Sequence, residues 1–166
     1  MRYLEDFEPG ETLTLGTYEV TEAEVRRFGE AYDPQPFHLD DEAGRAFHFG
    51  GLVASGWHTA AIFQRLYVDG LLRDAAVEGS PGSDELRWIR PVRPGDVLTG
   101  VVTPLGAGPS LSRPDCGLVR KRCELRDAAG EVVFRMTLHV LFRRRPVAAT
   151  ASTGAPDDPR AVTHTS

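Results

Sequence analysis

Cysteine is scarce in this 166-residue sequence, which contains only Cys116 and Cys123. The two residues are seven positions apart in a segment that reads as a strand. A rise of about 3.3 Å per residue sets them too far apart for a disulfide bond. We therefore expect two ordinary reduced thiols, and neither a disulfide framework nor a cysteine metal site.

The sequence also lacks an excess of positive charge, since its formal net charge at pH 7 is -5. A surface that binds nucleic acid usually leaves a basic footprint, so we expect no nucleic-acid partner. The N-terminus carries no apolar run of the secretory type, and no apolar run is long enough to span a bilayer. The sequence thus favours a cytoplasmic protein without a membrane partner.

The most apolar stretch runs from Phe49 to Leu72, with the sequence FGGLVASGWHTAAIFQRLYVDGLL. From Ser55 onward it reads as a helix whose surface is interrupted only by a narrow polar stripe, formed by Ser55, His58, Arg65 and Asp69. An amphipathic surface helix would have a wide polar face instead. We therefore expect a central helix that is buried on nearly every side, with other structure wrapped around it.

Glycine gathers at the N-terminal end of this helix, at Gly50, Gly51 and Gly56. The first N–H groups of a helix have no partner within the helix, and glycine lets a ligand approach the backbone closely. The chemistry of the protein is therefore expected at this end.

The rest of the chain predicts one α+β domain over residues 1–146, with an antiparallel sheet curled over the central helix. A short helix is expected after the capping box of Thr21 and Glu24, and it should stop before Pro34. The expected strands are Thr12 to Val20, Glu85 to Arg90, Val97 to Leu105, Gly117 to Arg126 and Glu131 to Arg143.

The connections are predicted from their turn-forming residues. We expect an extended passage from Asp33 to His38, a helical turn from Asp40 to Ala46, surface loops at Arg73 to Asp84 and Gly106 to Asp115, and a hairpin turn at Asp127 to Gly130. Residues 147–166 contain scarcely any large apolar side chain, so this tail is predicted to be disordered.

Asp33 and His38 are the sharpest candidates for chemistry. The prolines between them, Pro34 and Pro36, stiffen the path and hold a carboxylate and an imidazole at a fixed separation, which suits proton transfer. The alternative is that Asp33 is a turn residue and His38 a hydrogen-bonded surface histidine. The spacing alone does not separate these two interpretations.

Three motifs carry a resemblance to a known family. The segments YDPQPFH (Tyr32 to His38), FGGLVASGWHT (Phe49 to Thr59) and RPVRPGD (Arg90 to Asp96) occur in this order. Together they resemble the MaoC-like acyl dehydratases, which are relatives of the (R)-specific enoyl-CoA hydratases. The resemblance covers about Phe7 to Arg144 and implies the hot-dog fold, a long helix wrapped by an antiparallel sheet.

The same resemblance implies the site. It places Asp33 and His38 at the catalytic positions and gives the Gly56 N–H to the thioester oxygen, a role that suits the first turn of a helix. The expected substrate-binding residues are Phe37, Gly51, Ser55, Trp57 and Gln64. The sequence departs from the family pattern at Tyr32, Gln35, Phe37 and Gln64, which alters the pocket wall but not the two proton-transfer groups.

The resemblance thus implies a hydratase or dehydratase acting on the 2,3 bond of an enoyl-CoA or 3-hydroxyacyl-CoA. Coenzyme A would be part of the substrate, with no redox cofactor and no metal. Two alternatives stay open: a hot-dog thioesterase, and a non-catalytic module that only binds acyl-CoA. A homodimer or an assembly of dimers is expected, because one sheet on one helix leaves an edge strand and a cleft exposed.

Other patterns are weaker. His38, Asp40, Asp41 and His48 fit no standard metal-ligand spacing. Ser55 with His58 lacks the G-x-S-x-G elbow of a serine nucleophile, and the serine is better explained as a helix N-cap. The runs Arg120 to Arg122 and Arg143 to Arg145 are usually solvated strand ends, although one of them suits the phosphates of coenzyme A.

Overall fold

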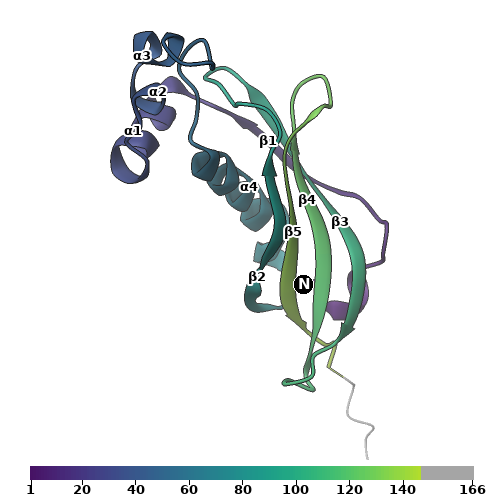
Figure 1. Ribbon diagram of the computed structural model, residues 1–166. Helices are drawn as coiled ribbons and strands as arrows, with labels where there is room; N and C mark the ends of the chain where they lie inside the picture. The colour runs from purple at the N-terminus through teal and green to yellow at the C-terminus, as the bar shows by residue number, and fades with distance from the viewer. Residues whose placement is uncertain (147–166) are drawn as a thin grey trace, which may run out of the picture.

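The computed structural model describes residues 1–146. Helices and strands are largely separated along the chain (Figure 1). The helices come mostly before the strands, as expected for an α+β domain. In chain order the elements are η1 (Leu4–Asp6), β1 (Leu13–Glu19), α1 (Glu22–Tyr32), α2 (Pro36–Leu39), α3 (Asp41–Arg45), α4 (Gly56–Gly70), η2 (Leu72–Asp74), β2 (Val77–Trp88), β3 (Val97–Pro109), β4 (Cys116–Arg126) and β5 (Val132–Arg143).

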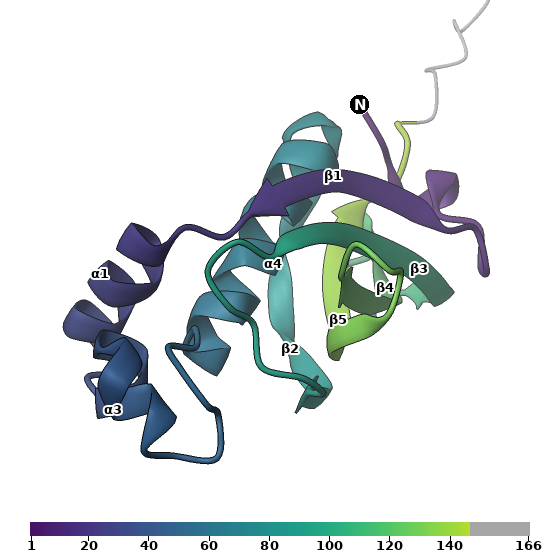
Figure 2. The ribbon, with the colours of Figure 1, turned by 90° about the horizontal axis from the view of Figure 1, so that it is seen from above.

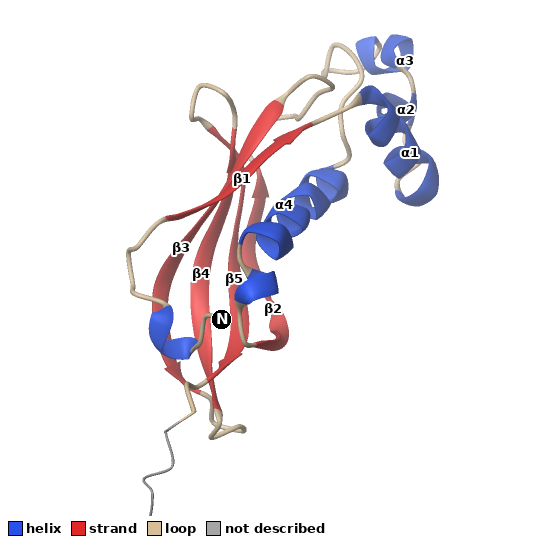
Figure 3. Ribbon diagram, turned by 180° about the vertical axis from the view of Figure 1, so that it is seen from behind, coloured by secondary structure: helices blue, strands red, loops and turns tan. Residues whose placement is uncertain are grey.

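The five strands form one antiparallel sheet in the order β1-β3-β4-β5-β2. The sheet therefore has β1 at one edge and β2 at the other. Helix α4 lies against one face of this sheet, and the arrangement is seen from both sides in Figures 1 and 3. The expected hot-dog architecture, an antiparallel sheet around one long helix, is confirmed.

Helix α4 packs on the sheet through Ile62, Phe63, Leu66 and Tyr67, all of which are buried. The Phe63 ring lies 6.1 Å from the ring of Phe134 on β5. Residues spaced three and four apart share one side of a helix, which is why this set forms the inward face.

The opposite face of α4 is open in the single chain, where Trp57, Ala61 and Gln64 are exposed. The prediction that α4 is buried on nearly every side is therefore wrong, because the sheet curls over one face only. The polar stripe is also placed differently. Its member His58 is buried, whereas Arg65 and Asp69 are exposed and pair with each other.

The helices α1, α2 and α3 gather beyond the N-terminal end of α4, which is visible in the view from above in Figure 2. Helix α1 begins with the predicted capping box, since the Thr21 side chain accepts from the Glu24 N–H and the Glu24 carboxylate accepts from the Thr21 N–H. Helix α3 is capped by Asp40, whose carboxylate accepts from the Ala43 N–H. Local sequence signals thus fix where these short helices start.

Three of the predicted connections are wrong. The extended passage ends at Gln35, because Pro36 becomes the first residue of α2, a position that suits its fixed φ and missing N–H. The predicted loop before residue 85 is mostly strand, since β2 starts at Val77. The loop predicted from Gly106 is shorter, since β3 continues to Pro109.

Lys121 is buried on the inward side of β4, with no exposed surface. Its ammonium nitrogen donates to the Tyr67 hydroxyl at 2.9 Å and lies 3.9 Å and 4.1 Å from the ring centroids of Phe7 and Phe142. Burial lowers the pKa of this amine to about 7.

Cys116 and Cys123 are both buried and free, as the sequence predicts. Among the described residues, no helix is long and apolar enough to cross a membrane. The predicted disorder of the tail concerns residues 147–166, which lie outside the described residues.

Candidate active site

A cavity of about 600 Å³ opens at the N-terminal end of α4. Its wall is built from α2, from the segment that leads into α4, and from the end of β2 and the segment after it. Asp33, His38 and Gly56 all line this cavity. Asp33 and His38 therefore meet Gly56, which comes later in the chain, at the end of the helix where chemistry was expected.

Asp33 is held in place by backbone and side-chain bonds. It is the C-cap of α1, and its N–H donates to the Gly29 carbonyl at 2.9 Å. One carboxylate oxygen accepts from the Ser55 hydroxyl at 2.7 Å, and the other accepts from the Gln35 amide at 2.8 Å. These bonds fix the carboxylate and leave it half-buried at the cavity wall.

The same hydrogen bonds lower the pKa of the Asp33 carboxyl. The Ser55 hydroxyl lowers the pKa of this carboxyl most strongly, and the Gln35 amide and the nearby His38 lower it further, against the opposing effect of burial. Asp33 is therefore held as a carboxylate near neutral pH. An ionised carboxylate is an acceptor only, so it is suited to take or orient a proton.

His38 is buried on α2 and its ring is oriented by the main chain. The ring Nδ1 lies 2.8 Å from the Val53 carbonyl oxygen, which only accepts, so Nδ1 carries the proton and donates. The other nitrogen, Nε2, then faces Asp33 and lies 3.4 Å from its carboxylate oxygen. The carbonyl thus selects the tautomer that turns Nε2 toward the cavity.

Gly56 is the first residue of α4, and within residues 1–146 its N–H has no hydrogen-bond acceptor. The indole of Trp88 lies over it and donates to the Gly56 carbonyl at 2.7 Å. A Cβ at position 56 would lie only 2.5 Å from the Trp88 ring, so a side chain here would displace the indole or the helix end. The glycine therefore serves close packing and leaves a donor at the helix N-terminus.

The other predicted binding residues are placed in different ways. Phe37 and Trp57 line the cavity. Ser55 is buried behind Asp33, where it caps α4 by accepting from the Trp57 N–H and donates to the carboxylate, so it is a positioning residue. Gly51 and Gln64 do not line the cavity. Their binding roles stay predictions.

The weaker patterns are not brought together. Asp40 caps α3 and Asp41 pairs with Arg45, so neither joins His38 and His48 in the cavity. Within residues 1–146, no three His, Cys, Asp or Glu side chains are placed to share a metal ion. That the protein needs no metal stays a prediction.

The arginine runs lie away from the cavity. In the second run, Arg143 pairs with Glu78 near the start of β2, whereas the cavity is at the end of β2, where Trp88 lies. In the first run, Arg122 is aligned with Thr137 in the middle of β5. The arginine that lines the cavity is Arg90, which pairs with Asp127.

Two functional features were missed from the sequence. Trp88 belongs to the strand expected from residue 85, yet nothing in its neighbourhood indicates that it covers Gly56, 32 residues earlier in the chain. The Val53 carbonyl that orients His38 is a backbone group and leaves no sequence signal. The Arg90 to Asp96 motif, by contrast, was recognised, and its first residue lines the cavity.

Comparisons with known proteins identify the family of this chain. A family model described as a MaoC like domain matches residues 6–114. A MaoC-like dehydratase from Rhodospirillum rubrum, known as a crystal structure, is 45% identical, with a TM-score of 0.81 over 89% of this chain and 100% of that one. Its fold and much of its sequence are thus shared with this chain.

Two further relatives are more distant. The uncharacterized protein YdeM of Bacillus subtilis (strain 168) is 29% identical over 142 residues, which are 85% of this chain and 99% of that protein. The (R)-hydratase PhaJ1 of Pseudomonas aeruginosa is 19% identical, with a TM-score of 0.67 over 94% of this chain and 95% of that one, a likeness of fold. Because the family model spans Asp33, His38 and Gly56 together with α4, the chain belongs to the MaoC-like dehydratase family.

Proposed function

We propose that the protein adds water to, or removes it from, the 2,3 bond of an enoyl-CoA or 3-hydroxyacyl-CoA. The observation that carries this proposal is one constellation: a carboxylate and an imidazole 3.4 Å apart, in a cavity that also contains a helix N–H without an acceptor within residues 1–146. The named activity of the fold neighbour PhaJ1, an (R)-hydratase, supports the same reaction class.

The pair is suited to hold one water molecule. In the tautomer that carries its proton on Nδ1, the His38 ring presents a lone pair at Nε2, beside the carboxylate of Asp33. A water that donates one hydrogen to each acceptor satisfies both and points its oxygen into the cavity. Its oxygen attacks C3, one of its protons passes to the pair, and the pair returns a proton to C2. Which group takes and which gives the proton stays open.

Gly56 completes the reaction. When oxygen bonds to C3, the electrons of the double bond move toward the thioester oxygen, which gains negative charge. The Gly56 N–H points from the positive end of the α4 dipole and donates to that oxygen. The carbonyl re-forms when C2 takes its proton, so one water is added overall and no redox cofactor takes part.

The walls indicate where the parts of the substrate lie. Phe37, Phe49, Trp57 and Ile89 give the cavity an apolar surface that suits an acyl chain. Arg90 lies on the same wall with a half-exposed side chain, which makes it the best placed arginine for a phosphate of coenzyme A.

The proposed enzyme is a homodimer or an assembly of dimers. Trp57 and Ile89 at the cavity wall are exposed by 60% and 52% in the single chain, and β2 beside them is an edge strand. A partner that covers this apolar rim would bury surface that a monomer exposes to water. Light scattering at micromolar concentration tests this; a monomer would contradict it.

Crotonyl-CoA and longer enoyl-CoAs test the activity directly. The expected result is loss of the enone absorbance without release of free thiol, and the Asp33→Asn variant should lose this activity while it still binds the substrate. Thiol release would instead identify a thioesterase. Binding with neither change, across the chain lengths tried, would identify a non-catalytic acyl-CoA module.

A further inference from the structure

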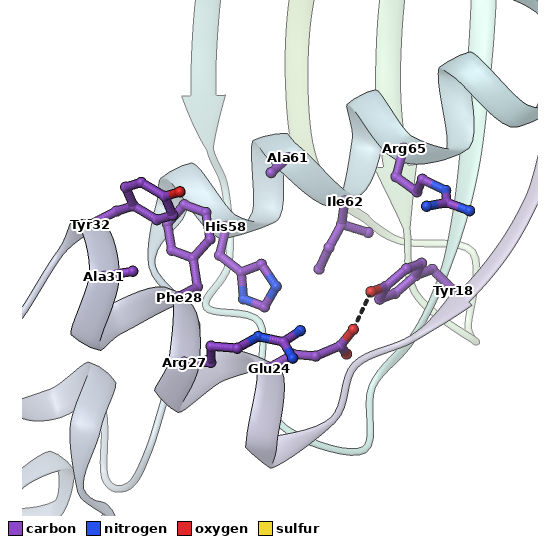
Figure 4. Close-up of a pocket in the computed structure, with 10 residues that line it drawn as sticks. All are labelled: Tyr18, Glu24, Arg27, Phe28, Ala31, Tyr32, His58, Ala61, Ile62 and Arg65. Carbon is purple, nitrogen blue, oxygen red and sulfur yellow. Dashed lines mark hydrogen bonds between the residues drawn. The ribbon is translucent and has the colours of Figure 1, made fainter.

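A second cavity, of about 410 Å³, lies between α1, β1 and α4 (Figure 4). It shares no lining residue with the candidate active site, and it lies on the opposite flank of α4, toward the β1 edge of the sheet. Its volume falls within the range of small-molecule sites. Nothing in the proposed hydratase mechanism uses it.

His58 supplies an unpartnered polar group to this cavity. Its ring stacks on Phe28, with centroids 4.9 Å apart, and only 6% of the residue is exposed. Among residues 1–146, neither ring nitrogen has a hydrogen-bond partner, and Nδ1 is sealed from solvent. Buried polar side chains are nearly always bonded, and the His58 ring is not. Nδ1 is closed off, so Nε2 is the ring nitrogen that a molecule in this cavity can reach.

The burial of His58 also indicates which hydrogen-bonding group it offers. Burial lowers the pKa of the His58 imidazole, so the ring is neutral and carries one N–H. A buried acceptor without a partner is tolerated better than a buried N–H without one. The sealed Nδ1 is therefore the acceptor, and the proton lies on Nε2, which can donate to a molecule in the cavity.

The charged groups of the cavity differ in their availability. Glu24 is occupied, since it accepts from the Tyr18 hydroxyl at 2.6 Å and from the Thr21 hydroxyl at 2.8 Å. Arg65 is also occupied, by Asp69. Arg27 has no carboxylate partner among the described residues, and its guanidinium lies near His58 in Figure 4. An available cation thus stands beside an available N–H donor.

We propose that this cavity is a second ligand site, which takes a small carboxylate with a short apolar tail. The carboxylate accepts from Arg27 and from the His58 Nε2–H, in charge-assisted hydrogen bonds. The tail lies on the apolar wall formed by Phe28, Ala61 and Ile62. The ligand would sit between the two helices whose ends carry Asp33 and Ser55, although it touches neither residue.

Hexanoate is a suitable probe, and histidine-selective ¹⁵N labelling reads the two cavities separately. His58 lines the second cavity, whereas His38 and His48 line the candidate active site. Titration with hexanoate should shift the ring nitrogens of His58 in a saturable way and leave those of His38 in place. The spectrum of His58→Phe assigns the signals. A shift at His38 without one at His58, or no shift at either, would overturn the proposal.

Variants then test the chemistry. Arg27→Gln, a change at an exposed residue, should weaken hexanoate binding about tenfold or more, the scale of one charge-assisted hydrogen bond. Arg73→Gln, at an exposed arginine outside the cavity, is the matched control and should leave the affinity unchanged. Hexanamide, which lacks the charge, should bind less tightly. Equal affinity of Arg27→Gln and the wild-type protein, or of the acid and the amide, would contradict a carboxylate site.

Discussion

His38 and His58 lie on opposite flanks of α4 and are equally buried, with exposed fractions of 5% and 6%. Their surroundings differ. The His38 ring is anchored by a main-chain carbonyl and faces a carboxylate, whereas His58 is stacked on Phe28 and leaves Nδ1 without a partner among the described residues. Burial alone therefore does not distinguish the histidine that we propose for proton transfer from the one that we propose binds a ligand; the partners of the ring nitrogens do.

The largest effect is expected from the pair itself. Asp33→Asn and His38→Ala should each lower turnover by about 10²-fold or more, the usual scale for general acid or base catalysis, and should change substrate affinity far less. The double variant should be little worse than the poorer single one, because both groups act on one reaction coordinate.

Turnover, ligand affinity and thermal melting of all three variants check this prediction. A matched control is His139→Ala, since His139 pairs with Asp84 at 2.8 Å outside the candidate active site. It should retain full turnover. Near-wild-type turnover of His38→Ala would remove the distinction between the two buried histidines.

The next largest effect is expected at Gly56, the first residue of α4. Gly56→Ala keeps the N–H but adds a Cβ at 2.5 Å from the Trp88 indole, so the donor should be displaced and turnover should fall about tenfold or more. The double variant Gly56→Ala with Trp88→Ala creates space and should recover part of the lost rate. If Gly56→Ala alone is fully active, the donor is not at this position.

A smaller effect is expected at Ser55. Its hydroxyl is the main cause that holds the pKa of Asp33 low, so Ser55→Ala should raise that pKa. The carboxylate then protonates at higher pH, and the acid limb of the pH–rate profile should move upward. The variant should also lose about 1 kcal/mol of stability with the N-cap. An unchanged acid limb would show that Asp33 is not the group that titrates.

The smallest effect is expected on the free energy of unfolding, which replacement of the two buried histidines should change in opposite directions. His58→Leu removes a buried nitrogen without a partner, so it should raise the free energy of unfolding by about 1 kcal/mol. His38→Leu should lower it, because the buried Val53 carbonyl loses its hydrogen-bond donor. Thermal melting of both variants without ligand checks the signs. A destabilised His58→Leu would show that the ring is already satisfied.

The spacing of Asp33 and His38 left two interpretations open, but the sequence was sufficient to predict the central helix and the capping box at Thr21. Those features depend on local spacing and on the restrictions that proline imposes, which act within a few residues. The meeting of this pair with Gly56 required the family resemblance, because the contact joins α1, α2 and α4.

The features that could not be predicted depend on contacts between segments that are far apart in the sequence. Residues 77–84 contain Gly79, Pro81 and Gly82 and have the composition of a loop, yet they form β2 because β5 lies alongside. Gly79 and Gly82 have positive φ, and the register shifts around them. Tertiary context outweighs weak local preference here. His58 was misjudged for the same reason, since only the packing of α1 against α4 reveals that it is buried.

The buried amine described above has a practical consequence, because Lys121 is the only lysine in the sequence. Reagents that acylate primary amines should therefore find only the N-terminal amine on the folded chain. Access to Lys121 requires the sheet to separate from α4, since Tyr67, Phe7 and Phe142 enclose its ammonium. The rate at which a second acyl group is incorporated then reports how often the core opens, without any substitution in the protein.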